Sequence, residues 1–521
     1  MMTLESIDAY EKGEFANVPL GLCRPHIVDN GTTLPGRSRY LLLFRHRYLD
    51  FRLAEVQALA EVGYGKVNDG NDGLPVIVWE KPAGGLVASP FWYIHLPTEA
   101  AELILLVILR RSMLVRCALE LWGEGSSWEE LQSVVADYIP VDKAKYAAAD
   151  QSFKFVVESW GQMATQEEKL DIIESFEKCT KLSGPIDLKS PMHHFWAIKC
   201  DIPDKNLSCL PPLPQRYYFG RQILAEETCS VRLNKLPIYD LKKRRYIGPT
   251  SMDPELSYIM CAMGGVQKHS LFLDPFVGTG SVLIAAADIG AHTLGTDIDI
   301  RVIKHGKKDK KGQPVNIWTN FQDYELPAPL GLLRLDLNRS PFRQHLEEIL
   351  DVIVADPPYG VRAGARKSRS DPDAVIPDRA THIAATSPYT LAECLRDLVE
   401  SAARWLCVGG KLVYWTPCAP GYYLEEELPK HPAMEMEANC EQVLALRYSR
   451  RLIVMRKVRK YDGKAAREYY EKIGTPKMAL DDLRDYVYST LDDEGTTAAS
   501  GGEMKDGDHH VPRTRLRNKF I

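Results

Sequence analysis

The 521-residue chain has few of the features that mark secreted, membrane-spanning or zinc-dependent proteins. Its eleven cysteines include no CxxC pair, so neither a disulfide framework nor a zinc site is predicted. The longest apolar run, Leu103–Leu109, is far too short to span a membrane, and no charged-then-apolar signal sequence opens the chain. We therefore expect a soluble intracellular protein with reduced thiols, located in the cytoplasm.

An excess of charge of one sign is also missing. The net charge is only −5, so any surface that binds nucleic acid must be local. The chain further lacks a GxGxxG fingerprint, which disfavours a dehydrogenase. At 521 residues it is long enough for two or three domains.

In place of that fingerprint, a glycine-rich turn joins an expected strand to an expected helix. The strand is Ser270–Asp274, the turn is Pro275–Ser281, and a helix of small residues begins at Val282. Glycines allow a ligand to lie close to the backbone, below the N-terminus of the helix. Such a turn on its own is weak evidence of a nucleotide site.

Four expected strands in succession end at an aspartate. These residues are Asp274, Asp297, Asp336 and Asp356. The step from the first to the second is the roughly 20–25 residues of one βαβ unit, which suits a carboxylate that grips ribose hydroxyls. The third aspartate suits an adenine amine. Together they predict one shared cleft at the edge of a mostly parallel sheet.

The fourth strand, Val352–Ala355, ends in the turn Asp356-Pro357-Pro358-Tyr359-Gly360. The prolines stiffen the backbone and hold its carbonyls outward. A carboxylate and a rigid carbonyl can accept both hydrogens of an aromatic amine, while the tyrosine stacks on the ring that carries it. The turn therefore predicts methyl transfer to a base amine, with the base taken out of its stack.

The N-terminal half alternates short strands and helices, which predicts an α+β region. Ser152–Trp160 has the alternation of a half-buried strand, and Thr165–Glu168 has the form of a capping box that opens a helix to about Cys179. Rings and cations alternate in Tyr217–Arg221 and Lys242–Tyr246, a pattern that suits RNA and equally suits a solvated charge run. The candidate RNA-binding cations are Lys154, Arg221, Lys242, Lys243, Arg244 and Arg245.

The C-terminal part predicts the rest of a seven-stranded sheet. Cys440–Tyr448 and Leu452–Val458 are expected to form an antiparallel hairpin that ends the otherwise parallel order. Residues 304–314 are interpreted as a solvated basic loop with a secondary role in RNA contact, and 362–388 as a mobile lid.

The motifs resemble a known family. Tyr246–Asp253, Leu273–Gly280 and Asp356–Gly364, with the N-terminal Tyr40–Leu53, are similar to the catalytic subunit of eukaryotic tRNA (guanine-10-N2)-methyltransferases. The resemblance implies a THUMP RNA-binding domain followed by a Rossmann-like class I methyltransferase domain. It also implies S-adenosyl-L-methionine as cofactor, S-adenosyl-L-homocysteine as product, tRNA rather than DNA as substrate, and a small zinc-binding activator subunit as partner.

The same resemblance implies a role for each matching residue. Asp356, Pro357, Pro358 and Tyr359 would form the catalytic turn that holds the guanine N2 amine. Asp297 would take the ribose hydroxyls and Asp336 the adenine. The remaining cofactor-binding residues would be Thr250, Ser251 and Asp253, and then Asp274, Phe276, Gly278, Thr279 and Gly280.

The expected domains follow the chain in order. They are an extension (1–38), an α/β domain (39–98), a THUMP-like domain (99–205), a linker (206–245), the methyltransferase domain (246–460) and a partly disordered basic tail (461–521). Other readings stay open: methylation of N2 of guanine or N6 of adenine at another RNA site, or an inactive nucleotide-binding RNA adaptor. A cytosine C5 methyltransferase would need a nucleophile such as Cys418, for which a packed thiol is the simpler interpretation.

Overall fold

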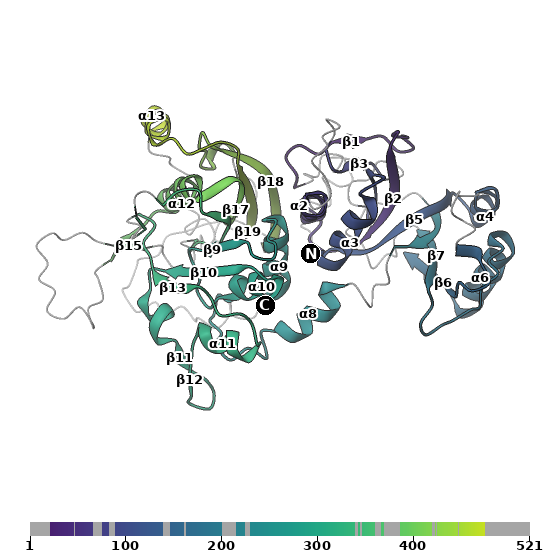
Figure 1. Cartoon of the computed structure of the whole chain (residues 1–521), viewed down its shortest axis with the longest axis horizontal. Coiled ribbons are helices and arrows are strands. Elements are labelled where there is room, and N and C mark those ends of the chain that lie inside the picture. Colours follow the sequence, from purple (N-terminus) through teal and green to yellow (C-terminus); the bar gives the residue numbers. More distant parts are fainter. Residues whose placement is uncertain are drawn as a thin grey trace, which may run out of the picture.

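The computed structural model of the chain contains two large sheets set side by side (Figure 1). It describes residues 21–45, 47–65, 75–82, 89–138, 146–160, 163–200, 215–223, 230–338, 342–343, 346–359, 366–368, 386–418, 423, 425–445 and 448–474. The predictions for the first twenty residues, for most of the lid and for the tail beyond residue 474 lie outside these ranges.

The N-terminal unit is built on an eight-stranded sheet. Its order is β1-β3-β4-β2-β5-β8-β7-β6, with β6 and β7 parallel at one end. The strands are β1 (Ile27–Val28), β2 (Arg37–Phe44), β3 (Val78–Glu80), β4 (Phe91–Pro97), β5 (Val115–Gly125), β6 (Phe153–Trp160), β7 (His193–Cys200) and β8 (Arg216–Gln222). The helices are α2 (Phe51–Tyr64), α3 (Ala101–Arg111), α4 (Trp128–Asp137) and α6 (Gln166–Thr180), with α8 (Val231–Tyr239) leading out of the unit.

This sheet crosses two of the expected domain boundaries. Strand β2 pairs with both β4 and β5, so the sheet continues through residue 98. Strand β8 lies inside the expected linker 206–245, yet it pairs with β5 and β7. The physical reason is burial, because Tyr217, Tyr218 and Phe219 of β8 are at most 6% exposed and pack in the unit's aromatic cores. The capping box at Thr165 is confirmed at the start of α6.

The C-terminal unit contains the predicted seven-stranded sheet, in the order β13-β10-β9-β14-β17-β19-β18. The strands are β9 (Leu271–Asp274), β10 (His292–Asp297), β13 (Gly331–Arg334), β14 (Leu350–Ala355), β17 (Leu406–Cys418), β18 (Met434–Ala445) and β19 (Tyr448–Lys457). The first five of the sheet order are parallel, and β19 and β18 are antiparallel. The antiparallel end is thus confirmed.

Helices and small hairpins surround this sheet. The helices are α9 (Pro254–Met263), α10 (Ser281–Ile289), α11 (Ile317–Asp323), α12 (Leu391–Trp405) and α13 (Gly463–Ile473), with single turns η3 (Arg301–His305) and η4 (Glu425–Glu427). Two-stranded ladders are formed by β11 (Lys307–Lys308) with β12 (Pro314–Val315), and by β15 (Arg366–Ser368) with β16 (Thr386–Pro388). Among the described helices, none combines the length and the apolar character that a membrane span needs.

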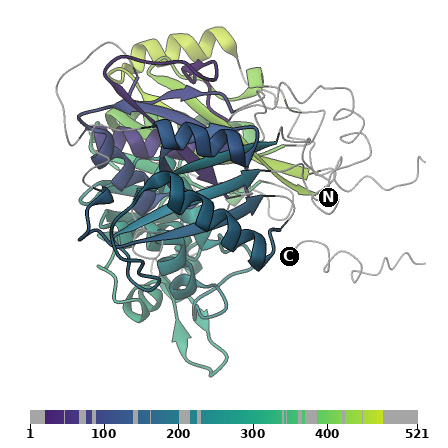
Figure 2. The same cartoon turned by 90° about the vertical axis from the view of Figure 1, so that its right-hand side faces the viewer.

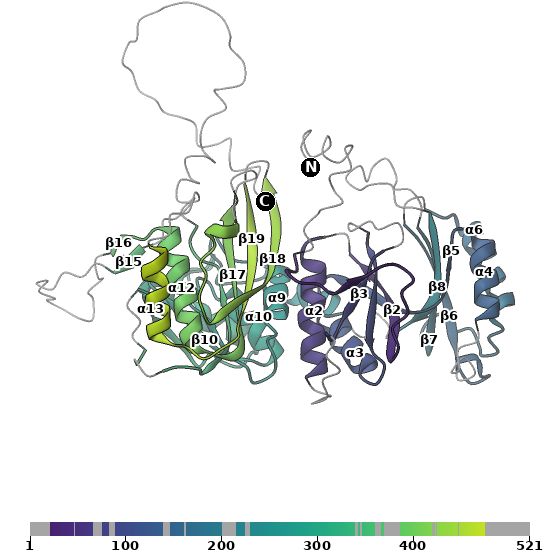
Figure 3. The same ribbon diagram turned by 90° about the horizontal axis from the view of Figure 1, so that it is seen from above.

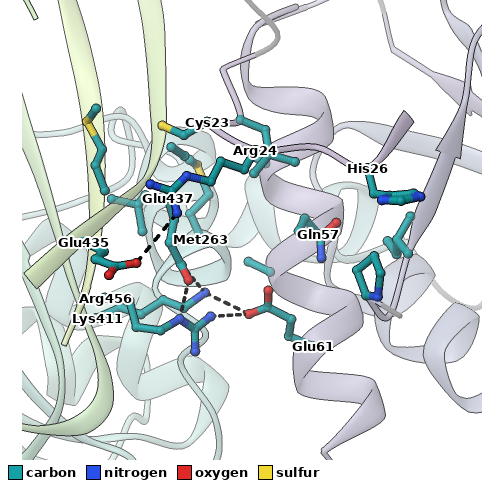
Figure 4. Close-up of a pocket in the computed structure, with 18 of the residues that line it drawn as sticks. Cys23, Arg24, His26, Gln57, Glu61, Met263, Lys411, Glu435, Glu437 and Arg456 are labelled. Atoms are coloured by element: carbon teal, nitrogen blue, oxygen red, sulfur yellow. Dashed lines mark hydrogen bonds and ion pairs between the residues drawn. The ribbon is translucent and has the colours of Figure 1, made fainter. Parts of the chain in front are cut away.

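The two units share one hydrophobic core. Helix α2 lies between the sheets (Figure 3), and the ring of Phe51 is 5.9 Å from that of Trp415 on β17. Polar contacts follow the same boundary, where Glu61 of α2 pairs with Lys411 and Arg456 around a cavity of about 240 Å³ (Figure 4). A continuous core and these ion pairs set the orientation of one unit on the other.

The N-terminal segment also reaches the far edge of the second sheet. Leu22 forms an antiparallel bridge with Ala438 of β18. The amide of Cys23 donates to the Glu437 carbonyl at 2.9 Å, and the amide of Asn439 donates to the Gly21 carbonyl at 2.8 Å. Part of the last edge strand is therefore covered by residues from the start of the described chain.

Candidate active site

The carboxyl ends of the parallel strands bring the four predicted aspartates to one edge of the sheet. Asp274 and Asp297 are the last residues of β9 and β10, which run in register as neighbours. Asp356 follows the end of β14, and Asp336 lies two residues beyond β13. Burial raises the pKa of Asp274 well above its ordinary value, and the charges of Asp356 and Asp297 raise it further. The four predicted aspartates thus lie along one edge of the sheet.

The glycine-rich turn sits directly above Asp274. The amide of Phe276 donates to Asp274 Oδ1 at 3.0 Å. Gly278 and Gly280 have φ angles of +48° and +78°, a conformation that side chains disfavour. A Cβ on Gly280 would come within 3.0 Å of Ile317. The turn therefore presents bare backbone at the N-terminus of α10, which suits a ligand that approaches closely.

Asp297 is held by backbone donors on both of its oxygens. The amide of Gly278 donates to Oδ2 at 3.2 Å and that of Asp299 to Oδ1 at 2.9 Å. Burial raises the pKa of Asp297, whereas these hydrogen bonds act in the opposite direction. The carboxylate is thereby fixed in place beside the turn, with lone pairs left for the hydroxyls of a diol.

The segment before the turn contributes one direct contact. Ser251 Oγ lies 2.7 Å from Thr279 Oγ1 and accepts the amide of Gly248 at 2.9 Å. Asp253 instead caps α9, where Oδ1 accepts the amide of Glu255 at 2.8 Å. Thr250 is exposed. The structure thus brings Ser251 to the predicted cofactor cradle and uses Asp253 as a helix cap.

Asp336 follows β13, the strand at one end of the sheet order. Its Oδ1 accepts the amide of Asn338 at 3.0 Å. Tyr389, which sequence reasoning missed, packs against Phe276 and donates its hydroxyl to Asp397 Oδ2 at 2.5 Å. The charge of Asp336 is among the causes that raise the pKa of Tyr389, after burial and nearer groups. This region therefore combines an aromatic ring with carboxylates on the side predicted for adenine.

The turn predicted to be catalytic has a partner that was not predicted. The Tyr359 hydroxyl donates to Asp356 Oδ1, and Arg450 Nη1 donates to the Tyr359 oxygen at 3.2 Å. Arg450 Nη1 also lies 4.0 Å from Asp356 Oδ1, and its guanidinium stacks 3.9 Å from the Trp415 ring. Burial raises the pKa of Asp356, while Arg450 and the Tyr359 hydrogen bond lower it.

Arg450 was missed because it lies 94 positions after Asp356 on another strand. Its place is set by the antiparallel register that puts it opposite Pro417. A sequence signal does exist in the expected hairpin, where Arg450 and Arg451 stand between two apolar stretches. Two adjacent arginines in a strand do not by themselves indicate contact with Asp356; the pairing of β17 with β19 determines it.

The predicted RNA-binding cations fall into separate places. In the N-terminal unit, Lys154 lies on β6, and Arg221 on β8 pairs with Glu120 at 2.8 Å. In the second unit, Lys242 and Lys243 are exposed. These four residues therefore do not form one continuous patch.

The next two cations of the same run, Arg244 and Arg245, contact other residues of the second unit. Arg245 pairs with Asp309 and Asp323 at 3.3 Å each. Arg244 is only 5% exposed and donates to Ser281 Oγ at 2.7 Å. The prediction of a surface role for Arg244 is therefore wrong, because its guanidinium is buried against the start of α10 and braces that helix.

Cys418 has the properties of a packed thiol. It is 1% exposed, and burial raises its pKa to about 11. Its sulfur lies 2.8 Å from Ser449 Oγ. A nucleophilic cysteine needs a lowered pKa, so this geometry disfavours C5 chemistry on cytosine.

Comparison with known proteins gives the same two-part organisation. A Tmrp11 THUMP N-terminal domain matches residues 38–228, which include β8, and an RMKL-like methyltransferase domain matches residues 242–372. The match to the crystal structure of TrmN from Thermus thermophilus covers 81% of this chain and 100% of that one, at 17% identity and a TM-score of 0.36.

Curated relatives are much closer in sequence. The tRNA (guanine(10)-N(2))-methyltransferase TRMT11 of Homo sapiens is 35% identical over 444 residues, 82% of this chain and 90% of that protein. The protein of the same description from Dictyostelium discoideum is 33% identical over 442 residues, 81% of this chain and 83% of its own. The chain therefore belongs to the family of tRNA (guanine(10)-N(2))-methyltransferases, the family that its motifs resemble.

Proposed function

We propose that this chain transfers a methyl group from S-adenosylmethionine to the exocyclic N2 amine of guanosine 10 in tRNA. The observation that carries the proposal is the position of the Asp356-Pro357-Pro358-Tyr359 turn. It lies at the carboxyl edge of the sheet, on the strand next to the one that feeds the glycine-rich turn. Such an arrangement supports an amine-binding role for this turn, beside a nucleotide-binding role for the glycine-rich turn.

The residues present fit the cofactor. A polar, positively charged ligand of this kind needs carboxylates at its ribose hydroxyls and its adenine amine, and a close backbone approach along its methionine part. Asp297 would take the ribose hydroxyls and Asp336 the adenine amine, while Asp274, Phe276, Gly278, Thr279 and Gly280 would hold the methionine part. When bound, S-adenosylmethionine supplies the electrophilic methyl group.

The chain's own contribution is to hold the amine in line. Among the described residues, no donor contacts Asp356 Oδ2, so this oxygen and the Pro357 carbonyl are the acceptors for the two amine hydrogens. The Tyr359 hydroxyl donates to Oδ1, which leaves Oδ2 for the amine while the Tyr359 ring stacks on the base. Catalysis then comes chiefly from positioning and from hydrogen bonds to the amine.

Asp356 also serves as the proton acceptor. The base nitrogen becomes more acidic as its fourth bond forms, so a strong base is not needed. Burial raises the pKa of Asp356, which makes the carboxylate a better acceptor, and Arg450 keeps it ionised beforehand by acting the other way. Arg450 is in our proposal a positioning residue for both Tyr359 and Asp356.

The wider organisation follows from the family. We propose that residues 246–460 form the methyltransferase domain and that the sheet running from β1 to β8 presents tRNA to it. The family resemblance supports a small zinc-binding activator subunit as partner and a cytoplasmic location.

Methyl transfer from labelled S-adenosylmethionine to a tRNA transcript tests the proposal directly. The full chain is assayed with and without the activator subunit. A transcript with guanosine at position 10 should yield N2-methylguanosine, and a transcript with adenosine at that position should take up no label. Label on adenine or cytosine would overturn the substrate assignment. Cofactor binding without any transfer would favour an inactive adaptor.

A further inference from the structure

A basic hairpin follows β10, the strand that ends at Asp297. The sequence predicted a solvated loop at 304–314, but the structure forms the β11–β12 ladder there. Figures 1 and 2 show this hairpin projecting from the methyltransferase unit. Lys304, Lys307, Lys308, Lys310 and Lys311 are all exposed on or beside it.

Both ends of the hairpin are rooted at the carboxyl edge of the sheet. Before it, η3 follows the end of β10, and Arg334 at the end of β13 donates to the Ile298 carbonyl at 3.1 Å. After it, α11 begins at Ile317, the residue that closes over Gly280 of the glycine-rich turn. The hairpin therefore rises on the same side as the cofactor cradle and Asp356.

Internal contacts hold the hairpin stiff. Asp309 is the centre, because its Oδ1 accepts the amides of Lys311 and Gln313 at 2.9 Å each. Arg245 reaches Asp309 and Gln313 at 3.3 Å each.

A further contact ties the hairpin to the segment that precedes the glycine-rich turn. Lys307 donates its Nζ to the Ile247 carbonyl. The next residue, Gly248, donates its amide to Ser251, which in turn contacts Thr279 in the cofactor cradle. The base of the hairpin is thus connected to the cradle through a short chain of hydrogen bonds.

The acidic groups near the hairpin are paired with arginines, whereas its lysines are exposed. The side chain of Asp309 is 11% exposed and paired with Arg245, and Asp299 is paired with Arg301 at 2.7 Å. Within the part of the chain that the structure describes, Lys304, Lys308, Lys310 and Lys311 have no carboxylate partner within 4.0 Å. On a chain of net charge −5, this is a local concentration of positive charge on a pre-ordered scaffold.

We propose that the β11–β12 hairpin binds the phosphate backbone of the tRNA beside the nucleotide that enters the site. This inference rests on the proposed function, which makes tRNA the substrate. Flexible ammonium groups on a stiff support act as point charges toward phosphates without reading base sequence. Lys310 and Lys311 lie in the turn that joins β11 to β12, so the tip of the hairpin carries two of its exposed positive charges.

The test compares two triple variants that remove the same charge. One is K308A/K310A/K311A on the hairpin. The matched control is K460A/K464A/K472A at and beside α13, which lies at the other end of the methyltransferase unit in Figure 1. All six lysines are exposed, so neither variant disturbs a core. Circular dichroism and thermal unfolding confirm that both fold.

Binding of a labelled tRNA transcript to the full chain is measured by anisotropy at increasing salt, with and without the activator subunit. The hairpin variant should weaken binding at least tenfold near 0.1 M salt, and the slope of log K against log salt should fall by roughly 2–3. The control should change neither. K308R/K310R/K311R should bind like the unaltered chain, because the charge is kept.

Methyl transfer separates the two proposals. At saturating tRNA the hairpin variant should keep its kcat and show a raised KM. Equal affinity and equal salt slope in the two triple variants would overturn the hairpin proposal, as would a lowered kcat at unchanged affinity. If the unaltered chain binds tRNA with this salt dependence but forms no N2-methylguanosine, the proposed function fails while the hairpin proposal stands.

Discussion

The ion-pair cluster between the two units allows a quantitative prediction for Glu61→Gln. In the close-up of Figure 4, Glu61 of α2 faces Lys411 and Arg456 of the opposite sheet. Its Oε2 lies 3.1 Å from Lys411 Nζ and 2.6 Å from Arg456 Nη2. Lys411 keeps a second carboxylate, Glu437, at 2.9 Å, and Arg456 pairs with Glu437 as well. The substitution therefore removes one charge without leaving either cation unpaired.

The magnitude follows from these contacts. Hydrogen bonds to charged groups contribute about 1.5–3 kcal/mol each, but the Glu61 side chain is one-third exposed and solvent screens part of that. With Glu437 retained, we expect Glu61→Gln to lower the free energy of unfolding by about 1–2 kcal/mol at pH 7. Burial alone would raise the pKa of Glu61, but Lys411 and Arg456 hold it below its ordinary value of 4.5. The contribution is thus present above pH 4.5 and is lost as the pH falls below it.

Urea denaturation followed by tryptophan fluorescence measures the loss. The matched control is Glu435→Gln, because Glu435 lines the same cavity, is 52% exposed and lies 3.9 Å from a largely exposed Arg24. The control should cost less than about 0.5 kcal/mol. A double-mutant cycle with Arg456→Met should give a coupling of about 1 kcal/mol. Equal midpoints for Glu61→Gln and Glu435→Gln, or zero coupling, would refute the reasoning.

Three further predictions concern single charges. Asp356→Asn should lower kcat for methyl transfer by at least 100-fold while leaving the Kd for S-adenosylmethionine within about twofold, as checked by calorimetry; parallel loss of both would merge roles that we separate. Arg450→Met should shift the acidic limb of the pH profile of kcat upward, because the guanidinium holds the pKa of Asp356 down; an unmoved limb would exclude the positioning role. Glu80 is fully buried, and its contacts with Arg39 and His95 lower its pKa to about 2. Glu80→Gln should therefore lower the free energy of unfolding by about 3 kcal/mol at pH 7, and by progressively less below pH 4.5, as measured by urea denaturation. A difference that stays constant with pH would contradict this linkage.

The parts of the fold that local pattern decides were predictable from the sequence. The strand that ends at Asp356, the glycine-rich turn and the capping box at Thr165 each depend on neighbouring residues. Four aspartates at expected strand ends were enough to place them along one edge of the sheet, because the carboxyl ends of parallel strands meet there. The antiparallel hairpin at the C-terminal end followed from two apolar runs close together in sequence.

What the sequence did not predict depends on distant pairing. Arg450 reaches Asp356 only through the register of β17 with β19. Arg244 was predicted to lie on the surface, but its guanidinium donates a hydrogen bond to Ser281 Oγ. Strand β8 was taken for a linker, since its partners β5 and β7 are set by burial of its aromatic residues. No local signal separates an exposed cation from one that braces a helix.

The bridge between Leu22 and Ala438 has a consequence for the order of events during synthesis. The two paired residues are 416 positions apart, and a ribosome adds roughly 5–20 residues each second. The segment that covers β18 is therefore made roughly 20–80 s before its partner strand exists. The N-terminal unit can complete its sheet within that interval, so the covering of this last edge can occur only after β18 has been made.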